Sequence, residues 1–178
     1  HLGISLMGMA QVAAATPHLT YACDTHYPWQ TEEDEVVTGG RVPIVDGCVT
    51  IPDKPGLGVE LDYDQLARGR ERYAKCPYRK RDASQTHLVP GENPVDAERR
   101  TYAALEVGCL DLIGKSVGQP VCDLLGGRVR DKVPFSAYPF YKHAGGGGEG
   151  EDAREDKYGE CLSPETLVGQ VIKMRGEY

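Results

Sequence analysis

The sequence predicts an α/β protein assembled from parts of a (β/α) barrel. Residues 1–26 run as a helix, a short strand and a polar loop, and residues 94–141 run from helices into a second strand. In such a barrel, the residues that follow the C-terminal end of a strand face the mouth of the active site. The chain has 178 residues, 40% of them hydrophobic, and its mean hydropathy is −0.44. These values suit a globular chain with a limited core.

The first 15 residues are expected to form a packed amphipathic helix. Their apolar positions recur at helical spacing, at Leu2, Leu6, Met9 and Val12, and they lack the basic leader of a signal peptide. The helix should stop before Pro17. A short strand is predicted at 18–23, with the polar run Asp24-Thr-His26 at its end.

The stretch that follows predicts a hairpin and a second helix. Two β-rich runs flank Asp46-Gly47, a dipeptide typical of tight hairpin turns. After a short strand at 59–61, Asp62 or Asp64 can cap a helix.

The second half of the chain begins at a predicted junction. Residues 84–93 lie in a stretch with several helix breakers and no apolar period. Asn93 and Pro94 can then open a long helix, and a shorter one should stop at Gly126-Gly127. The inward-facing residues of the long helix are expected to be Tyr102, Leu105, Cys109, Leu112 and Ile113.

A strand should start at Val133, and Ser163-Pro164 should open the last helix after a Gly-rich loop. The predicted organisation therefore comprises four parts, which are residues 1–83, the junction 84–93, residues 94–132 and residues 133–178.

Charge and cysteine content narrow the classes of function. A formal charge of −7 argues against nucleic acid as a partner, and no apolar run reaches the ~18 residues of a membrane span. The six cysteines show no zinc-ligand spacing. Reduced thiols in a cytoplasmic protein are expected, with three disulfides as the alternative. These residues are Cys23, Cys48, Cys76, Cys109, Cys122 and Cys161.

Two long motifs carry a family resemblance. The passage from Ala104-Leu-Glu to Leu124-Leu-Gly-Gly127 resembles the transition from capping domain to first barrel strand in the mandelate racemase/muconate lactonizing enzyme branch of the enolase superfamily. The passage from His1-Leu-Gly-Ile-Ser-Leu to Asp24-Thr-His-Tyr-Pro-Trp-Gln30, continuing to 55–60, is similar to the C-terminal part of its glucarate dehydratase-like subgroup. The resemblance implies a partial (β/α) TIM-type barrel with a piece of the α+β capping domain, in permuted order.

The resemblance also implies a chemistry. Members of this subgroup are Mg²⁺-dependent acid-sugar dehydratases, which are carbon–oxygen lyases that abstract the proton α to a carboxylate and then eliminate water. A carbon acid needs charge stabilisation on its oxygens before it can lose that proton near neutral pH. The implied ligands are Mg²⁺ and an acid-sugar dicarboxylate, and the intact family implies a cytoplasmic homo-oligomer.

Four residues match substrate-contacting positions of the family. They are His26, Arg81, Tyr138 and Phe140. Each also has a plain structural reading, as a histidine bonded within its loop, a surface charge or an aromatic residue packed at the barrel top. The family's catalytic bases and metal ligands have no counterpart here, so the resemblance implies that the isolated chain is inactive and that the Mg²⁺ ligands lie outside it.

Two alternatives remain open from the sequence. The chain can be a non-catalytic remnant or subunit that binds a full-length partner of the same superfamily. It can also be a small secreted binding domain held by disulfides, and a count of free thiols separates this reading from the others.

Overall fold

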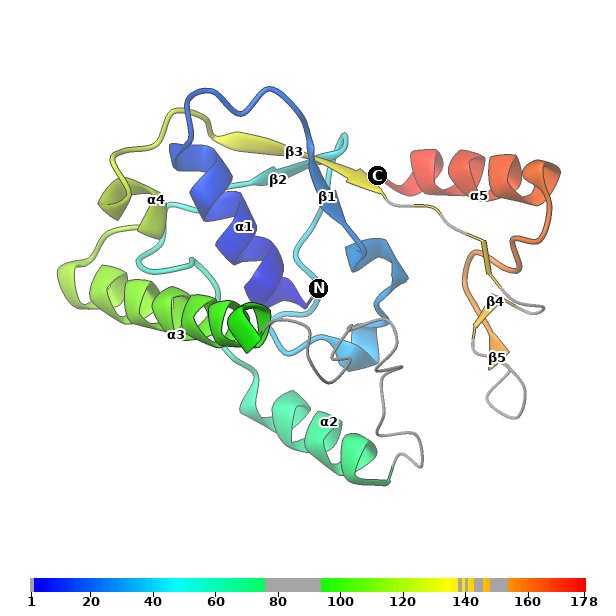
Figure 1. The fold of residues 1–178 in the computed structure, drawn as a ribbon, viewed down its shortest axis with the longest axis horizontal. Helices are drawn as coiled ribbons and strands as arrows, with labels where there is room; N and C mark the ends of the chain where they lie inside the picture. The colour runs from blue at the N-terminus through cyan, green and yellow to red at the C-terminus, as the bar shows by residue number, and fades with distance from the viewer. Residues whose placement is uncertain (1, 76–93, 138, 140, 143–145, 148–153) are drawn as a thin grey trace.

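The computed structural model describes residues 2–75, 94–137, 139, 141–142, 146–147 and 154–178. Five α-helices and three short strands form most of this part of the chain (Figure 1). In order they are α1 (Gly3–Ala15), β1 (Cys23–Thr25), β2 (Cys48–Thr50), α2 (Tyr63–Lys75), α3 (Pro94–Val117), α4 (Val121–Leu124), β3 (Lys132–Ala137) and α5 (Pro164–Glu177). Two 3₁₀ turns, η1 (Tyr27–Trp29) and η2 (Glu32–Asp34), follow β1, and the two-residue strands β4 (Gly146–Gly147) and β5 (Arg154–Glu155) precede α5.

The central sheet joins strands that are far apart in the chain. Its order is β1–β3–β2. β1 runs parallel to β3 with Thr25 opposite Ala137, and β2 runs antiparallel to β3 with Val49 opposite Val133. Residues on both sides of the predicted junction therefore belong to one mixed α/β structure.

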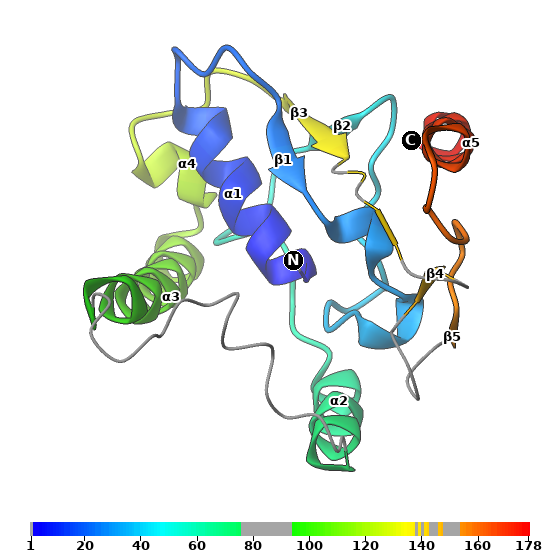
Figure 2. The same cartoon turned by 45° about the vertical axis from the view of Figure 1, so that its right-hand side comes forward.

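The core lies between α1 and this sheet. Leu6, Met7 and Ala10 of α1 are buried together with Val133 and Phe135 of β3. The alanines of α1 bring its backbone close to the sheet, and α4 lies beside it (Figure 2). The predicted first helix is thus confirmed, but Val12, which was expected to pack, is half exposed because the helix buries the face centred on Ala10.

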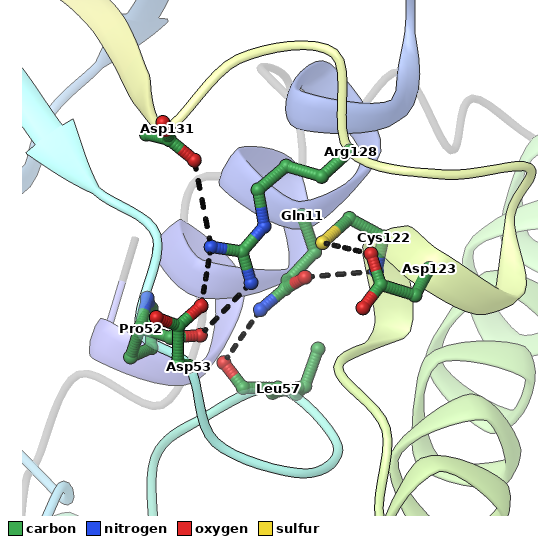
Figure 3. A network of polar contacts seen from close by, with 8 residues as sticks. All are labelled: Gln11, Pro52, Asp53, Leu57, Cys122, Asp123, Arg128 and Asp131. Carbon is green, nitrogen blue, oxygen red and sulfur yellow. Dashed lines mark hydrogen bonds and ion pairs between the residues drawn. The ribbon is translucent and has the colours of Figure 1, made fainter.

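A buried amide adds a polar link across the core (Figure 3). Gln11 is fully buried; its Nε2 donates to the carbonyl of Leu57 at 3.2 Å, and its Oε1 accepts from the backbone N–H of Cys122 at 2.9 Å. Nearby, the Arg128 guanidinium bonds Asp53 at 2.6 Å. Because a buried backbone group without a partner is costly, Gln11 fixes the distance between the 52–57 loop and α4.

The strand predictions need two corrections. The strand expected at 18–23 is wrong, because only residues 23–25 lie opposite β3, and Tyr21 is 84% exposed. The turn at Asp46-Gly47 is confirmed, with φ of 51° and 68°. However, the runs that flank the turn do not pair along their length, since beyond the Val45–Cys48 bridge the second run pairs with β3.

The helix positions are confirmed at α2, α3, α4 and α5. Asp62 Oδ1 accepts from the N–H of Gln65 at 2.8 Å, which makes it the cap of α2. Ser163 caps α5 and accepts from the N–H of Thr166.

The predicted inward face of α3 is wrong. The helix packs through Val107, Leu110, Asp111 and Gly114. Gly114 sits against the backbone of Gly56, where a Cβ would approach within 2.8 Å of the Gly56 nitrogen. This contact turns the expected core residues outward, and all of them are exposed. They are Tyr102, Leu105, Cys109, Leu112 and Ile113.

The described residues also test two expectations, which concern membrane spans and disulfide bonds. No helix in the described part of the chain is long and apolar enough to cross a membrane. The five described cysteines are free thiols, which gives the disulfide-bonded alternative no support. The junction at 84–93 lies outside the described residues.

Candidate site at the ends of the parallel strands

The two parallel strands end at the same level and open onto a pocket. Thr25 and Ala137, the last residues of β1 and β3, are paired in the register, and both line a pocket of about 330 Å³. The C-terminal edge of parallel strands is where barrel enzymes place their sites. The other lining residues come from η1, the 44–47 turn, β3 and the residue 139 beyond it, and α5 with the residue that follows it; they include Ile44, Phe135, Met174, Arg175 and Tyr178.

His26 stands directly after β1 at this edge. It is exposed, and its carbonyl accepts from the N–H of Trp29 at 3.0 Å to begin η1. The hydroxyl of Thr25 accepts from the N–H of Tyr27 at 3.0 Å, which fixes the turn. The sequence therefore located His26 correctly at a strand end, although the residue is not among those that line the pocket.

A buried carboxylate, that of Glu35, stabilises the turn that follows β1. Glu35 is 2% exposed and accepts from the N–H groups of Gly3, Val36 and Val37 and from the Tyr27 hydroxyl. Leu2 offers no capping side chain to α1, so Glu35 satisfies the N-terminal N–H of that helix and places negative charge at its positive end. A Cβ on Gly3 would lie 2.9 Å from the carboxylate oxygens, so the approach requires glycine.

Tyr27 and Arg41 connect this support to the pocket wall. Burial, together with the hydrogen bond to Glu35, raises the pKa of the Tyr27 hydroxyl well above its usual value. Arg41 Nη2 donates to the Tyr27 carbonyl at 2.7 Å and approaches the Tyr178 hydroxyl at 3.4 Å. Burial alone would lower the pKa of Arg41, but the interaction with Tyr178 helps to outweigh it and the pKa is raised.

Helix α5 closes the other side of the pocket. Met174 is buried, and the hydroxyl of Tyr178 lies 3.2 Å from that of Tyr158. Tyr158 also donates to Glu177 at 2.8 Å. These contacts hold the C-terminal end of α5 against the pocket, with Arg175 as its cationic lining residue.

The other three predicted site residues cannot be placed in this geometry. Arg81, Tyr138 and Phe140 lie outside the described residues, so their assignments stay predictions. Sequence reasoning missed Glu35 and Arg41. The run of four acidic residues ending at Glu35 is typical of a solvated loop; the signal for burial was the apolar Val36-Val37 that follows it directly.

The chemistry of the pocket is limited. Among the described residues, its lining holds no carboxylate, histidine or lysine that could remove a proton from carbon. Over the described ranges, no group of three or more His, Cys, Asp or Glu residues could hold a metal ion. The described residues do not fit a Mg²⁺ site, and those that line the pocket supply apolar contact, hydroxyl groups and one guanidinium.

Comparison with known proteins finds relatives of the first part of the chain, which contains β1 and His26. The model of the enolase C-terminal domain-like family matches residues 1–66. The probable glucarate dehydratase of Streptomyces coelicolor is 52% identical over 67 residues, which are 38% of this chain and 15% of that protein. Residues 1–66 of this chain are therefore similar to members of the enolase superfamily. The identity to this relative supports its glucarate dehydratase-like subgroup, and the enolase C-terminal domain is of the TIM-barrel type, in agreement with the α/β class observed.

The enolase superfamily match leaves most of the relative uncovered. The chain spans 15% of the length of the curated relative. Among solved structures, an enolase from Pseudomonas fluorescens Pf0-1 with bound magnesium, potassium and tartrate is 63% identical over 44% of this chain and 18% of that chain, with a TM-score of 0.43. An enolase from Mycobacterium smegmatis complexed with formate and acetate is 56% identical over the same shares, with a TM-score of 0.41.

Proposed function

We propose that residues 1–66 of this chain are the C-terminal barrel segments of a glucarate-type acid-sugar dehydratase. The 52% identity to a probable glucarate dehydratase carries this proposal, since the family match at residues 1–66 includes β1 and His26 at its end. The reaction removes the proton α to a carboxylate and eliminates water. In the intact enzyme Mg²⁺ would stabilise the charge that develops on the carboxylate oxygens.

The contribution of these residues is to shape one side of the barrel mouth. Thr25 and Tyr27 fix the backbone at His26, and the proposal assigns to this imidazole a hydrogen bond with a substrate hydroxyl or carboxylate. Glu35 holds the beginning of α1 against the same turn. The base and the metal ligands belong to the remaining barrel, and the chain alone should not turn over glucarate.

The parallel pairing of β1 with β3 agrees with a shared barrel origin for the two halves. In a closed barrel the last strand is the hydrogen-bonded neighbour of the first. If β1 is a last strand and β3 a first strand, as the sequence motifs imply, their pairing is the native one even though the chain order is permuted.

A segment exchange tests the proposal. Residues 1–66 of this chain would replace the matching stretch of the Streptomyces coelicolor relative, and glucarate dehydration would be measured by the appearance of the keto product. We expect an active chimera, and His26→Ala should lower kcat/KM by about 10²-fold, the order of a lost positioning contact.

His18→Ala is the matched control, because His18 is exposed and lies before β1 rather than after it. An inactive but folded chimera would overturn the proposed reaction. An active chimera indifferent to His26→Ala would remove this histidine from the substrate contacts.

A further inference from the structure

The pocket at the ends of β1 and β3 has a wall that is apolar over most of its area. Ile44, Phe135 and Met174 are buried in it, and Ala137, Val171 and two prolines complete the apolar part. An acid sugar carries a hydroxyl or carboxylate oxygen on every carbon, and burying such oxygens against carbon is costly. The wall therefore suits a ligand whose buried part is hydrocarbon.

One cation stands beside this wall. Arg175 is the single charged residue among the described residues that line the pocket. Its side chain is exposed and makes no hydrogen bond or ion pair with another described residue. Arg41 and Arg128, by contrast, are bonded to a carbonyl and a carboxylate. A guanidinium presents a planar fork of donors that matches a carboxylate, so Arg175 favours an acidic group at one end of the ligand.

The hydroxyl of Thr25 adds a donor to the lining. Thr25 is 1% exposed, and its oxygen accepts from the N–H of Tyr27 at 3.0 Å. The proton of this hydroxyl has no acceptor among the described residues. A buried donor without a partner costs free energy, and an oxygen of a bound ligand would supply the missing acceptor.

The volume of the pocket limits the length of the ligand. It is about 330 Å³, near the lower end of the range for small-molecule sites. At roughly 30 Å³ for each small group, the value for a water molecule in the liquid, this space holds about eleven non-hydrogen atoms. A carboxylate takes three of them, which leaves about eight for the tail.

We propose that this pocket binds a monocarboxylate with an unbranched hydrocarbon tail, about eight to ten carbons in all, whose carboxylate pairs with Arg175. The inference goes beyond the proposed function, because His26, which that function assigns to the acid sugar, does not line the pocket. A second apolar space, the groove of about 670 Å³ between α1 and α3, has no cation among its described lining residues. It is therefore the internal comparison for a ligand that needs only an apolar surface.

A titration of the full chain with octanoate tests the proposal. The amide shifts of the ¹⁵N-labelled protein would be followed by NMR. We expect saturable binding with a dissociation constant near or below about 1 mM, and shifts centred on Gly47, Ala137 and Val171. Shifts centred on Gly8 and Val107 of the groove would overturn the proposal, and so would the absence of saturation at about ten times that concentration.

The neutral analogue octanamide tests the role of the charge without any substitution. It should bind about tenfold more weakly than octanoate, because it cannot form the ion pair with Arg175. Arg175→Gln should bring the affinity for octanoate down to that for octanamide. Lys173→Gln is the matched control, since Lys173 is exposed on the same helix and does not line the pocket.

Three further outcomes decide the class of ligand. Equal affinities of the wild type for octanoate and octanamide would overturn the proposal, as would an Arg175→Gln variant that still prefers octanoate tenfold. Glucarate should not displace octanoate, and displacement would assign the pocket to the acid sugar instead. The spectrum of each variant also reports its fold, and no step depends on catalysis.

Discussion

The buried carboxylate of Glu35 joins the first residue of α1, the backbone of Val36 and Val37, and the hydroxyl of Tyr27. Glu35→Gln keeps the shape but replaces one acceptor oxygen by an NH₂ group that faces N–H donors. We expect a loss of about 2 kcal/mol in the free energy of unfolding, the range for hydrogen bonds to charged groups. Urea denaturation measures it. Glu33→Gln, at an exposed position of η2, should change stability by less than about 0.5 kcal/mol, and equal effects would contradict the buried role.

Tyr27 predicts an alkaline limit to stability. Its folded-state pKa is raised by burial and by the bond to Glu35, so the folded protein keeps a proton that the unfolded chain loses near pH 10. The stabilisation is complete below that pH and is lost as the pH rises further. The measurement is tyrosinate absorbance during an alkaline titration. The Tyr27→Phe variant should have one ionisation-resistant tyrosine fewer than the wild type. Tyr21→Phe, at an exposed position, should leave that resistant fraction unchanged.

At the scale of elements, α3 offers a matched pair of glycines. A Cβ at Gly114 would lie 2.6 Å from the carbonyl oxygen of Gln119, whereas nothing lies within 4 Å of one at Gly108. Gly114→Ala should destabilise by about 1–3 kcal/mol through overpacking. Gly108→Ala should instead stabilise by about 0.5–1 kcal/mol, because alanine has the higher helix propensity. Thermal melts of both variants check this, and a neutral Gly114→Ala would mean that α3 does not dock on the 55–58 loop.

The elements also show what local sequence could predict. Breakers and caps such as Pro17, Asp62 and Ser163 act on their own neighbours, so the helices and the Asp46-Gly47 turn were predictable. The sheet partners were not, because pairing of β2 with β3 depends on residues more than eighty positions away. The buried face of α3 failed for the same reason. The close contact of Gly114 with the backbone of Gly56 decides which face of α3 is buried, although five apolar side chains lie on the other face. Hydrophobic periodicity does not detect a contact made through a glycine.

For the candidate site, the sequence placed His26 at a strand end but not the groups that hold it there. Glu35 and Arg41 come from loops whose local pattern is polar, and their burial depends on α1 and α5 closing over them. The family motifs indicated the reaction, and these motifs are short stretches of sequence. The residues that hold His26 in place depend on the packing of distant segments, so the sequence did not predict them.

The whole molecule leaves much apolar surface uncovered. The outer stripe of α3, the groove beside α1 and the exposed Val168 and Ile172 of α5 all face outward. A part-barrel with an open strand edge should have low stability by itself. We expect a broad, low thermal transition and concentration-dependent association for the purified chain. Calorimetry beside sedimentation checks both, and a sharp cooperative melt of a monomer would contradict the expectation.

The Gln11–Cys122 bond links residues 111 positions apart, and β1 finds its partner only at residues 135–137. During synthesis the first helix therefore emerges long before the segments that cover it. High contact order of this kind slows folding. Until β3 and α4 have been synthesised, the apolar surface of α1 stays exposed and can form non-native contacts. A nascent chain arrested before β3 has left the ribosome should be bound by chaperones, whereas one extended past it should be released.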